Sequence, residues 1–155
     1  MTELELRRHA RRDPAVDRLS AQGRAAAEDA GRQAGNAGVV YIAVFVSPAQ
    51  RAAETAAWFL RGAGQQLPDH GVVPGLGGQD ASGGSPEGMA AGVRALLDQV
   101  PDGGRGLAIS HTPLVERAAF GLTGVETAPM AELEGILVVR NDGGDLTVTE
   151  LRLAR

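Results

Sequence analysis

The spacing of hydrophobic and polar residues changes along the chain, and these changes predict the order of its strands and helices. Period-two and continuous apolar runs are typical of strands, whereas apolar positions three or four apart are typical of helices. Strands are expected over residues 3–8, 39–46, 106–110, 134–140 and 145–153, with a weaker one over 71–73. Helices are expected over about 20–34, 47–61, 85–100 and 113 to 121 or 123.

Capping residues and turns support these bounds. Ser20 is a plausible helix N-cap, and Asp13-Pro14 marks a turn before it. Ser47-Pro48-Ala49-Gln50 predicts a capping box, with serine at the N-cap, proline at the first helical position and glutamine at the third. Residues 141–144, Asn-Asp-Gly-Gly, predict a hairpin turn between the last two strands.

Residues 65–88 show the least clear pattern, and residues 75–84 within them are rich in glycine. A loop of this length in a compact domain is often a functional lid, and a bare linker is the alternative. We expect it to be mobile.

Strands that alternate with helices predict an α/β fold. We expect a three-layer α/β/α sandwich with a mostly parallel central sheet and an antiparallel C-terminal strand pair. The strand over 39–46 is almost continuously apolar, as expected of a strand buried on both faces. Residues 1–155 contain no internal repeat, so they are expected to form a single domain.

Composition narrows the functional classes. The net charge is −4 and only 3% of residues are aromatic, which argues against a nucleic-acid partner. All 15 basic residues are arginine, and the absence of cysteine excludes disulfides and thiolate sites. The longest apolar run, residues 39–46, is too short to span a bilayer. We therefore expect a cytoplasmic protein without a membrane partner.

Charged side chains follow three of the predicted parallel strands. Arg8 and His9 come after the first strand, Arg51 lies in the first helical turn after the second, and His111 follows the strand over 106–110. The carboxyl ends of parallel strands meet at one edge of a sheet, where ligands bind. Guanidinium groups and helix N-termini at that edge match the charge and geometry of a phosphate. Singly, each residue has a structural reading, such as a helix-surface arginine or a capping histidine.

Four blocks of sequence, in order, resemble the histidine phosphatase superfamily, also called phosphoglycerate mutase-like. Residues 6–10 resemble its Arg-His-Gly signature, and residues 17–23 are similar to the stretch that opens its first helix. Residues 47–56 resemble its Ser-Pro-x-x-Arg-x-x-x-Thr-Ala motif, and residues 109–113 resemble its Gly-His-x-Pro segment. The resemblance is strongest to the short, SixA-like phosphohistidine phosphatase branch, and it covers nearly the whole chain.

The resemblance implies a phosphoglycerate mutase-like fold and a phosphatase that needs no metal and no cofactor. His9 would be the nucleophile and would carry a phosphohistidine intermediate. Arg8, Arg51 and His111 would hold the three non-bridging oxygens of the phosphoryl group. Positive charge near His9 would lower its pKa and keep the imidazole neutral.

The sequence departs from the family pattern at three positions. Ala10 and Ser110 each replace a glycine, and Thr112 stands where some members carry an acidic proton donor. Glu87 and Asp80 are the candidates for the missing acid, and Asp13 is a weaker one. A phosphohistidine substrate could need no such acid, because its leaving group is better than that of an ester.

The short chain lacks the insertions that cover the site in mutases. We therefore expect an open site for a phosphorylated small molecule or a phosphoprotein. Two alternatives are a non-catalytic phospho-ligand-binding or regulatory protein, and an enzyme that uses the same fold for another reaction. The oligomeric state is left open.

Arg7 is expected to point away from the site, and Arg11 and Arg12 either steer an anionic substrate or are simply solvated. His70 is interpreted as a loop histidine.

Overall fold

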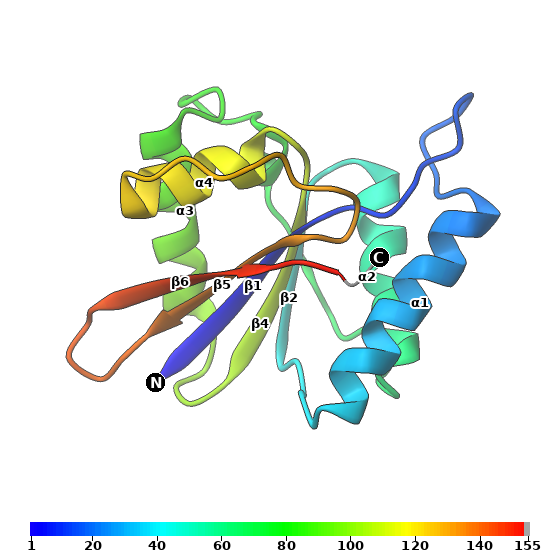
Figure 1. The fold of residues 1–155 in the computed structure, drawn as a ribbon, viewed down its shortest axis with the longest axis horizontal. Coiled ribbons are helices and arrows are strands. Elements are labelled where there is room, and N and C mark those ends of the chain that lie inside the picture. Colours follow the sequence, from blue (N-terminus) through cyan, green and yellow to red (C-terminus); the bar gives the residue numbers. More distant parts are fainter. Residues whose placement is uncertain (154–155) are drawn as a thin grey trace.

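The computed structural model describes residues 1–153 and has a six-stranded sheet at its centre (Figure 1). The strand order is β3-β2-β4-β1-β5-β6. The first four strands in this order are parallel, and β5 is antiparallel to both β1 and β6. The strands are β1 (Thr2–Arg8), β2 (Ala43–Val46), β3 (Gly71–Val72), β4 (Arg105–Ser110), β5 (Gly135–Arg140) and β6 (Leu146–Leu151). The predicted mostly parallel sheet with an antiparallel C-terminal pair is confirmed.

Two pairs of helices cover the sheet, one pair on each face (Figure 1). The helices are α1 (Ala21–Asn36), α2 (Gln50–Gly62), α3 (Pro86–Gln99) and α4 (Leu114–Thr123). The pair α1 and α2 packs on one side, and α3 and α4 pack on the other. Ser20 and Ser85 cap α1 and α3, since their hydroxyls accept hydrogen bonds from Gly23 N and Gly88 N. No helix in residues 1–153 is long and apolar enough to cross a membrane.

Alternation along β1 divides its side chains between two cores. Leu4 and Leu6 are fully buried in the core beneath α3 and α4. Glu5 and Arg7 face the other way, where Arg7 lies over the Phe59 ring of α2 at 5.1 Å from its centroid. Arg7 bonds to Glu5 and to the Leu133 carbonyl, and it makes no hydrogen bond to His9, Arg51 or His111 within residues 1–153.

Glu5 is the centre of a buried polar network. Its carboxylate is 1% exposed and accepts hydrogen bonds from Arg7 Nε at 2.7 Å, Tyr41 Oη at 2.6 Å and Arg105 at 2.8 Å. Burial, and then the Glu5 carboxylate, raise the pKa of Tyr41, which stays a donor. A buried charge is tolerated only when such partners surround it. The network joins the middle of β1 to β4 and to the chain before β2.

The strand predicted over 39–46 is wrong in its first half. Only Ala43–Val46 form β2, and Val40 and Ile42 are 61% and 48% exposed. The neighbour β4 explains the difference, because its pairing with β2 begins at Ala43 opposite Gly106. Upstream of that point Ile42 N still donates to the Arg105 carbonyl, but the Tyr41 backbone bonds to the Gln65 side chain instead of to a strand.

The glycine-rich segment is tied to the sheet at its start. Pro74–Gly77 form a short 3₁₀ helix, and Leu76 within it is buried. The hydroxyl of Ser110, at the end of β4, donates to the Leu76 carbonyl at 2.6 Å. The segment thus runs along the carboxyl edge of the sheet, where the candidate residues were predicted.

Close helix packing predicts opposite effects for two helical glycines. A Cβ on Gly31 of α1 would lie 1.7 Å from the Phe59 carbonyl oxygen of α2, whereas one on the exposed Gly92 of α3 would meet nothing within 4 Å. Gly31→Ala should therefore destabilise the protein by about 1–3 kcal/mol through overpacking. Gly92→Ala should stabilise it by about 0.5–1 kcal/mol through helix propensity. Urea unfolding of both variants checks this, and equal effects would contradict it.

Candidate active site

Three of the predicted site residues meet at the carboxyl edge of the parallel strands. His9 follows β1, Arg51 lies in the first turn of α2 behind β2, and His111 follows β4. Arg51 donates from Nε to His9 Nε2 at 3.3 Å, and its Nη2 lies 3.4 Å from His111 Nδ1. The two imidazole rings are 5.1 Å apart. One guanidinium therefore spans both histidines.

The contacts of His9 determine which ring nitrogen carries the proton. Nδ1 lies 2.6 Å from the Ala10 carbonyl oxygen, which can only accept, so Nδ1 is the protonated nitrogen. Nε2 receives a hydrogen bond from Arg51, which can only donate, so Nε2 carries the lone pair. His9 is 7% exposed, and its backbone N–H donates to the Ser110 carbonyl at 3.0 Å. The imidazole is thus held on both sides, with its Nε2 lone pair directed at Arg51.

His111 is oriented by the same logic. Its Nδ1 faces the Arg51 donor, so Nε2 carries the proton and donates to Ser47 Oγ at 2.6 Å. Ser47 is 1% exposed and lies at the end of β2. The Ser47 hydroxyl at the end of β2 therefore fixes the orientation of the His111 ring, which follows the neighbouring strand β4.

Both histidines are held neutral. Burial, followed by the positive charges of Arg51 and Arg8, lowers the pKa of His9, partly offset by its contact with the Ala10 carbonyl. Burial, followed by His9 and Arg51, lowers the pKa of His111 to about 4. The two neutral rings and the two arginines thus make a positively charged cluster, and a bound anion would neutralise its charge.

Arg8 reaches the site from a different direction. Its Nη1 donates to the Met130 carbonyl at 3.0 Å, in the loop that precedes β5. Its Nε is buried and has no hydrogen-bond partner in the described part of the chain. No hydrogen bond joins Arg8 to the other candidate residues, but its charge acts on both histidines.

Asp17 is a site residue that was not identified from the sequence. Its carboxylate binds Arg51 Nη1 at 2.9 Å and also accepts from the backbone N–H groups of Gln50 and Arg51. The Asp17 side chain thus caps α2 and also orients the guanidinium of Arg51. No local signal marks this role, because the partners lie more than 30 residues away in the sequence. Similarly, Thr55 accepts from Ala10 N at 3.0 Å and joins α2 to the residue after His9.

The capping box predicted for α2 is wrong. The N-cap is Ala49, whose side chain offers no cap, and the helix begins at Gln50. Ser47 is turned toward His111 instead, and Asp17 supplies the cap from another segment. Ser47 Oγ keeps only a long contact of 3.4 Å from Ala49 N, and its short bond is the one to the histidine.

None of the predicted proton donors contacts His9, Arg51 or His111. Glu87 is exposed in the first turn of α3 and has no hydrogen bond or ion pair within residues 1–153. Asp80 accepts from the backbone and hydroxyl of Ser82. A backbone hydrogen bond from Ala15 helps to lower the pKa of Asp13, which keeps it ionised.

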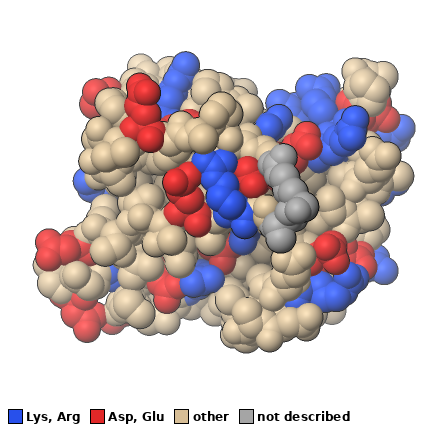
Figure 2. Space-filling view, in the orientation of Figure 1, with Lys and Arg blue, Asp and Glu red and all other residues tan. Residues whose placement is uncertain are grey.

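The remaining charged residues lie around the site rather than in it. Arg11, Arg12 and Arg18 are exposed, and Figure 2 shows basic side chains gathered at the upper right, over the segment that leads into α1. His70 is exposed, and its Nδ1 lies 3.4 Å from the Pro68 carbonyl oxygen, as expected of a loop histidine. In the described residues, no group of three or more His, Asp or Glu side chains could hold a metal ion.

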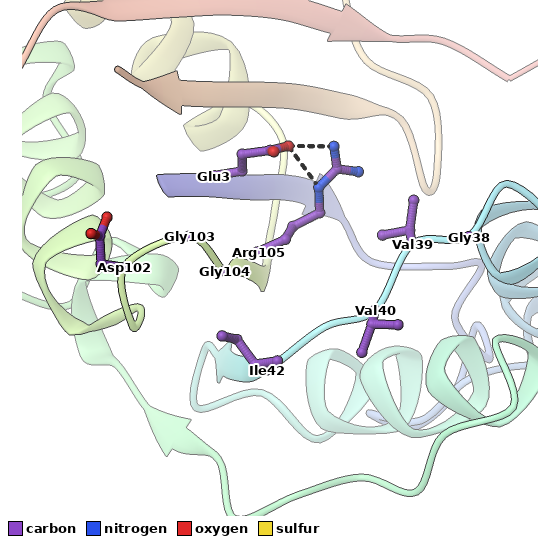
Figure 3. Close-up of a pocket in the computed structure, with 9 residues that line it drawn as sticks. All are labelled: Glu3, Gly38, Val39, Val40, Ile42, Asp102, Gly103, Gly104 and Arg105. Atoms are coloured by element: carbon purple, nitrogen blue, oxygen red, sulfur yellow. Dashed lines mark hydrogen bonds and ion pairs between the residues drawn. The ribbon is translucent and has the colours of Figure 1, made fainter. Parts of the chain in front are cut away.

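A separate hollow of about 470 Å³ lies at the opposite edge of the sheet (Figure 3). Glu3 and Arg105 pair there at the starts of β1 and β4, beside Val39, Val40 and Ile42. It contains none of the residues predicted to bind phosphate. We therefore place the candidate site at the carboxyl edge.

Known structures share this arrangement of elements. The protein histidine phosphatase SixA, solved with tungstate, is 25% identical, with a TM-score of 0.73 over 97% of this chain and 96% of its own. The Entamoeba histolytica phosphoserine phosphatase, solved with 3-phosphoglyceric acid, is 15% identical, with a TM-score of 0.75 over 100% and 98%. YhfR of Bacillus stearothermophilus is 17% identical, with a TM-score of 0.76 over 99% and 98%. No family model and no curated protein matches the sequence.

The double role of Asp17 predicts a loss of stability when it is removed. Asp17→Ala should destabilise the protein by about 1 kcal/mol, because α2 loses its N-cap and Arg51 its ion pair. Asp29→Ala is the control, since Asp29 makes an exposed pair with Arg32 within α1 and should change stability by less than about 0.5 kcal/mol. Urea unfolding measures both, and an Asp17 effect as small as the control would refute the capping role.

The low pKa of His111 predicts a pH-dependent stability. The unfolded chain takes up a proton near pH 6.5, whereas folded His111 does so only at about 4, so protonation favours unfolding between these values. Stability should fall as the pH drops from about 6.5 to 4, and the slope should be smaller in His111→Asn. The His111 ring resonances should titrate with a midpoint near 4 by NMR. A midpoint near 6.5 would contradict the buried, Arg51-facing environment.

Proposed function

We propose that this chain, which has the fold of the histidine phosphatase superfamily, is a metal-independent phosphatase that works through a phosphohistidine on His9. Its substrate would be a phosphomonoester or a phosphohistidine. The observation that carries the proposal is the state of His9: a buried, neutral imidazole whose Nε2 lone pair faces a guanidinium.

The chemistry of phosphoryl transfer suits this arrangement. Such reactions depend mostly on positioning the groups and on stabilising charge on the three equatorial oxygens. Without a ligand, two N–H groups of Arg51 point at the histidine nitrogens. A bound phosphoryl group would accept hydrogen bonds from these N–H groups instead. Arg8 and His111 would contribute further donors. The Asp17 ion pair keeps Arg51 in place while this exchange occurs.

The reaction would proceed in two displacements. His9 Nε2 attacks phosphorus, a P–N bond forms and the bond to the leaving group breaks. The proton on Nδ1 stays there and is held by the Ala10 carbonyl, so the phosphorylated ring carries a positive charge that the carbonyl stabilises. Water then attacks phosphorus, the P–N bond breaks, and inorganic phosphate and neutral His9 are released.

The likeness to two kinds of phosphatase supports a substrate held mainly by its phosphoryl group. The structural neighbours include a protein histidine phosphatase and a phosphoserine phosphatase, so the same fold serves both a phosphoramidate and a phosphate ester. The polar groups gathered around His9 are suited to the phosphoryl group, and we propose that a phosphorylated small molecule or phosphoprotein side chain binds here.

Replacing the nucleophile tests this function. The wild type should release phosphate from p-nitrophenyl phosphate and from phosphohistidine, and His9→Ala should lose this activity by at least about 10³-fold, since covalent catalysis is removed. Rapid acid-free quenching should trap a phosphohistidine on the wild type but not on the variant. His70→Ala, which changes a loop histidine, is the matched control and should keep its activity. Equal turnover by His9→Ala would refute the proposal.

A non-catalytic phospho-ligand binder is the second candidate, because Glu87, Asp80 and Asp13 all lack contact with His9. In that case inorganic phosphate would bind, but no substrate would yield a trapped phosphohistidine. The same quenching experiment therefore separates the two candidates.

A further inference from the structure

Ser47 and Arg51 contact different nitrogens of the His111 ring. Ser47 Oγ lies 2.6 Å from Nε2, whereas Arg51 Nη2 lies 3.4 Å from Nδ1. Because the serine occupies Nε2, Nδ1 is the ring nitrogen that faces the guanidinium. A phosphoryl group bound between Arg51 and the two histidines would therefore meet His111 at Nδ1.

A phosphoryl group and a guanidinium make opposite demands on this nitrogen. Arg51 can only donate, so Nδ1 carries a lone pair beside it and the ring proton is on Nε2. The oxygens of a phosphoryl dianion can only accept, so a His111 that binds one must carry a proton on Nδ1. The proposed role of His111 as a phosphate ligand therefore requires its protonation to change.

The hydroxyl of Ser47 suits both states of the ring. A hydroxyl accepts through its lone pairs and donates through its proton. Ser47 Oγ thus accepts from Nε2 when that nitrogen is protonated, and it can donate to Nε2 when the proton is on Nδ1. A carbonyl or a carboxylate at this place would permit only a protonated Nε2. The short contact between Ser47 and His111 can therefore persist while the ring changes.

The other contacts of Ser47 favour the state in which it donates. Ser47 is 1% exposed, and besides His111 its Oγ has only a long contact of 3.4 Å from Ala49 N. While Oγ accepts from Nε2, the hydroxyl proton has no acceptor within residues 1–153, which is unfavourable for a buried group. Donation to Nε2 satisfies this proton. The long contact of Arg51 with Nδ1 opposes that state, and a bound phosphoryl group would replace this contact.

We propose that Ser47 is a positioning residue that lets His111 exchange its tautomer when a phosphoryl group binds, an inference that rests on the proposed function. The partly exposed ring gives its Nε2 proton to water and takes one from water at Nδ1, so no net proton is gained. Ser47 then donates to Nε2, and Nδ1–H donates to a phosphoryl oxygen. Burial, followed by His9 and Arg51, lowers the pKa of His111, and this disfavours a ring protonated on both nitrogens.

Nitrogen-15 NMR of the histidine rings tests the exchange, because a ring nitrogen with a proton resonates far from one with a lone pair. At neutral pH the protonated nitrogen of His111 should be Nε2 before inorganic phosphate is added and Nδ1 at saturation. His111→Asn assigns the signals. By calorimetry, Ser47→Ala should bind phosphate about tenfold more weakly, the effect of one lost hydrogen bond, and Ser47→Thr should restore binding.

Ser110→Ala is the matched control for Ser47→Ala. Ser110 is also a buried serine at the end of a strand, but its hydroxyl donates to the Leu76 carbonyl and not to a histidine. Its replacement should leave the exchange in His111 unchanged.

Three results would overturn the proposal while phosphate still binds. These are a His111 ring that keeps its proton on Nε2 alone, a ring protonated on both nitrogens, and a Ser47→Ala variant that binds phosphate as tightly as the wild type. The phosphatase function would stand in each case, since turnover and the trapped phosphohistidine on His9 measure it separately. A wild type that neither binds phosphate nor releases it from p-nitrophenyl phosphate would instead overturn the proposed function.

Discussion

The ion pair between Asp17 and Arg51 is the contact on which the candidate site depends. Arg51 carries one positive charge to two neutral histidines, whose ring nitrogens can accept its hydrogen bonds but provide no opposite charge. Asp17 supplies the opposite charge at 2.9 Å and binds the first backbone N–H groups of α2 at the same time. The start of the helix and the direction of its guanidinium are therefore set by one carboxylate, which favours a site already organised before a ligand arrives.

The two faces of β1 explain how such a site can sit on a stable sheet. Leu4 and Leu6 fill one core, while Glu5 and Arg7 form a paired polar layer on the other face. Arg7 also binds the Leu133 carbonyl, so this layer supports the loop that precedes β5. Arg7 and Arg8 are adjacent in sequence, but strand alternation sends their side chains to opposite faces of the sheet, where Arg8 donates to the Met130 carbonyl.

The positive charge at the carboxyl edge of the sheet depends on where the charged side chains lie and not on the net charge of the chain. The chain is acidic overall, yet the side chains that meet in the candidate site are arginines and neutral histidines. Burial favours the neutral form of each imidazole, which leaves His9 with a lone pair and leaves room for a dianion. The Asp17 carboxylate is bound to Arg51 Nη1 and to the start of α2. A local positive field can thus exist on a protein of net charge −4.

The sequence by itself determined the layer order, the parallel sheet with its antiparallel pair, and the meeting of His9, Arg51 and His111, because all of these follow from hydrophobic period and from the residue after each strand. It could not determine that residues 39–42 lie outside β2, since that depends on where β4 begins. It also misplaced the cap of α2. Ser47 and Asp17 take their partners from distant segments, and such contacts have no period or spacing along the chain. Only the packing of these segments at the sheet edge decides which of their residues touch.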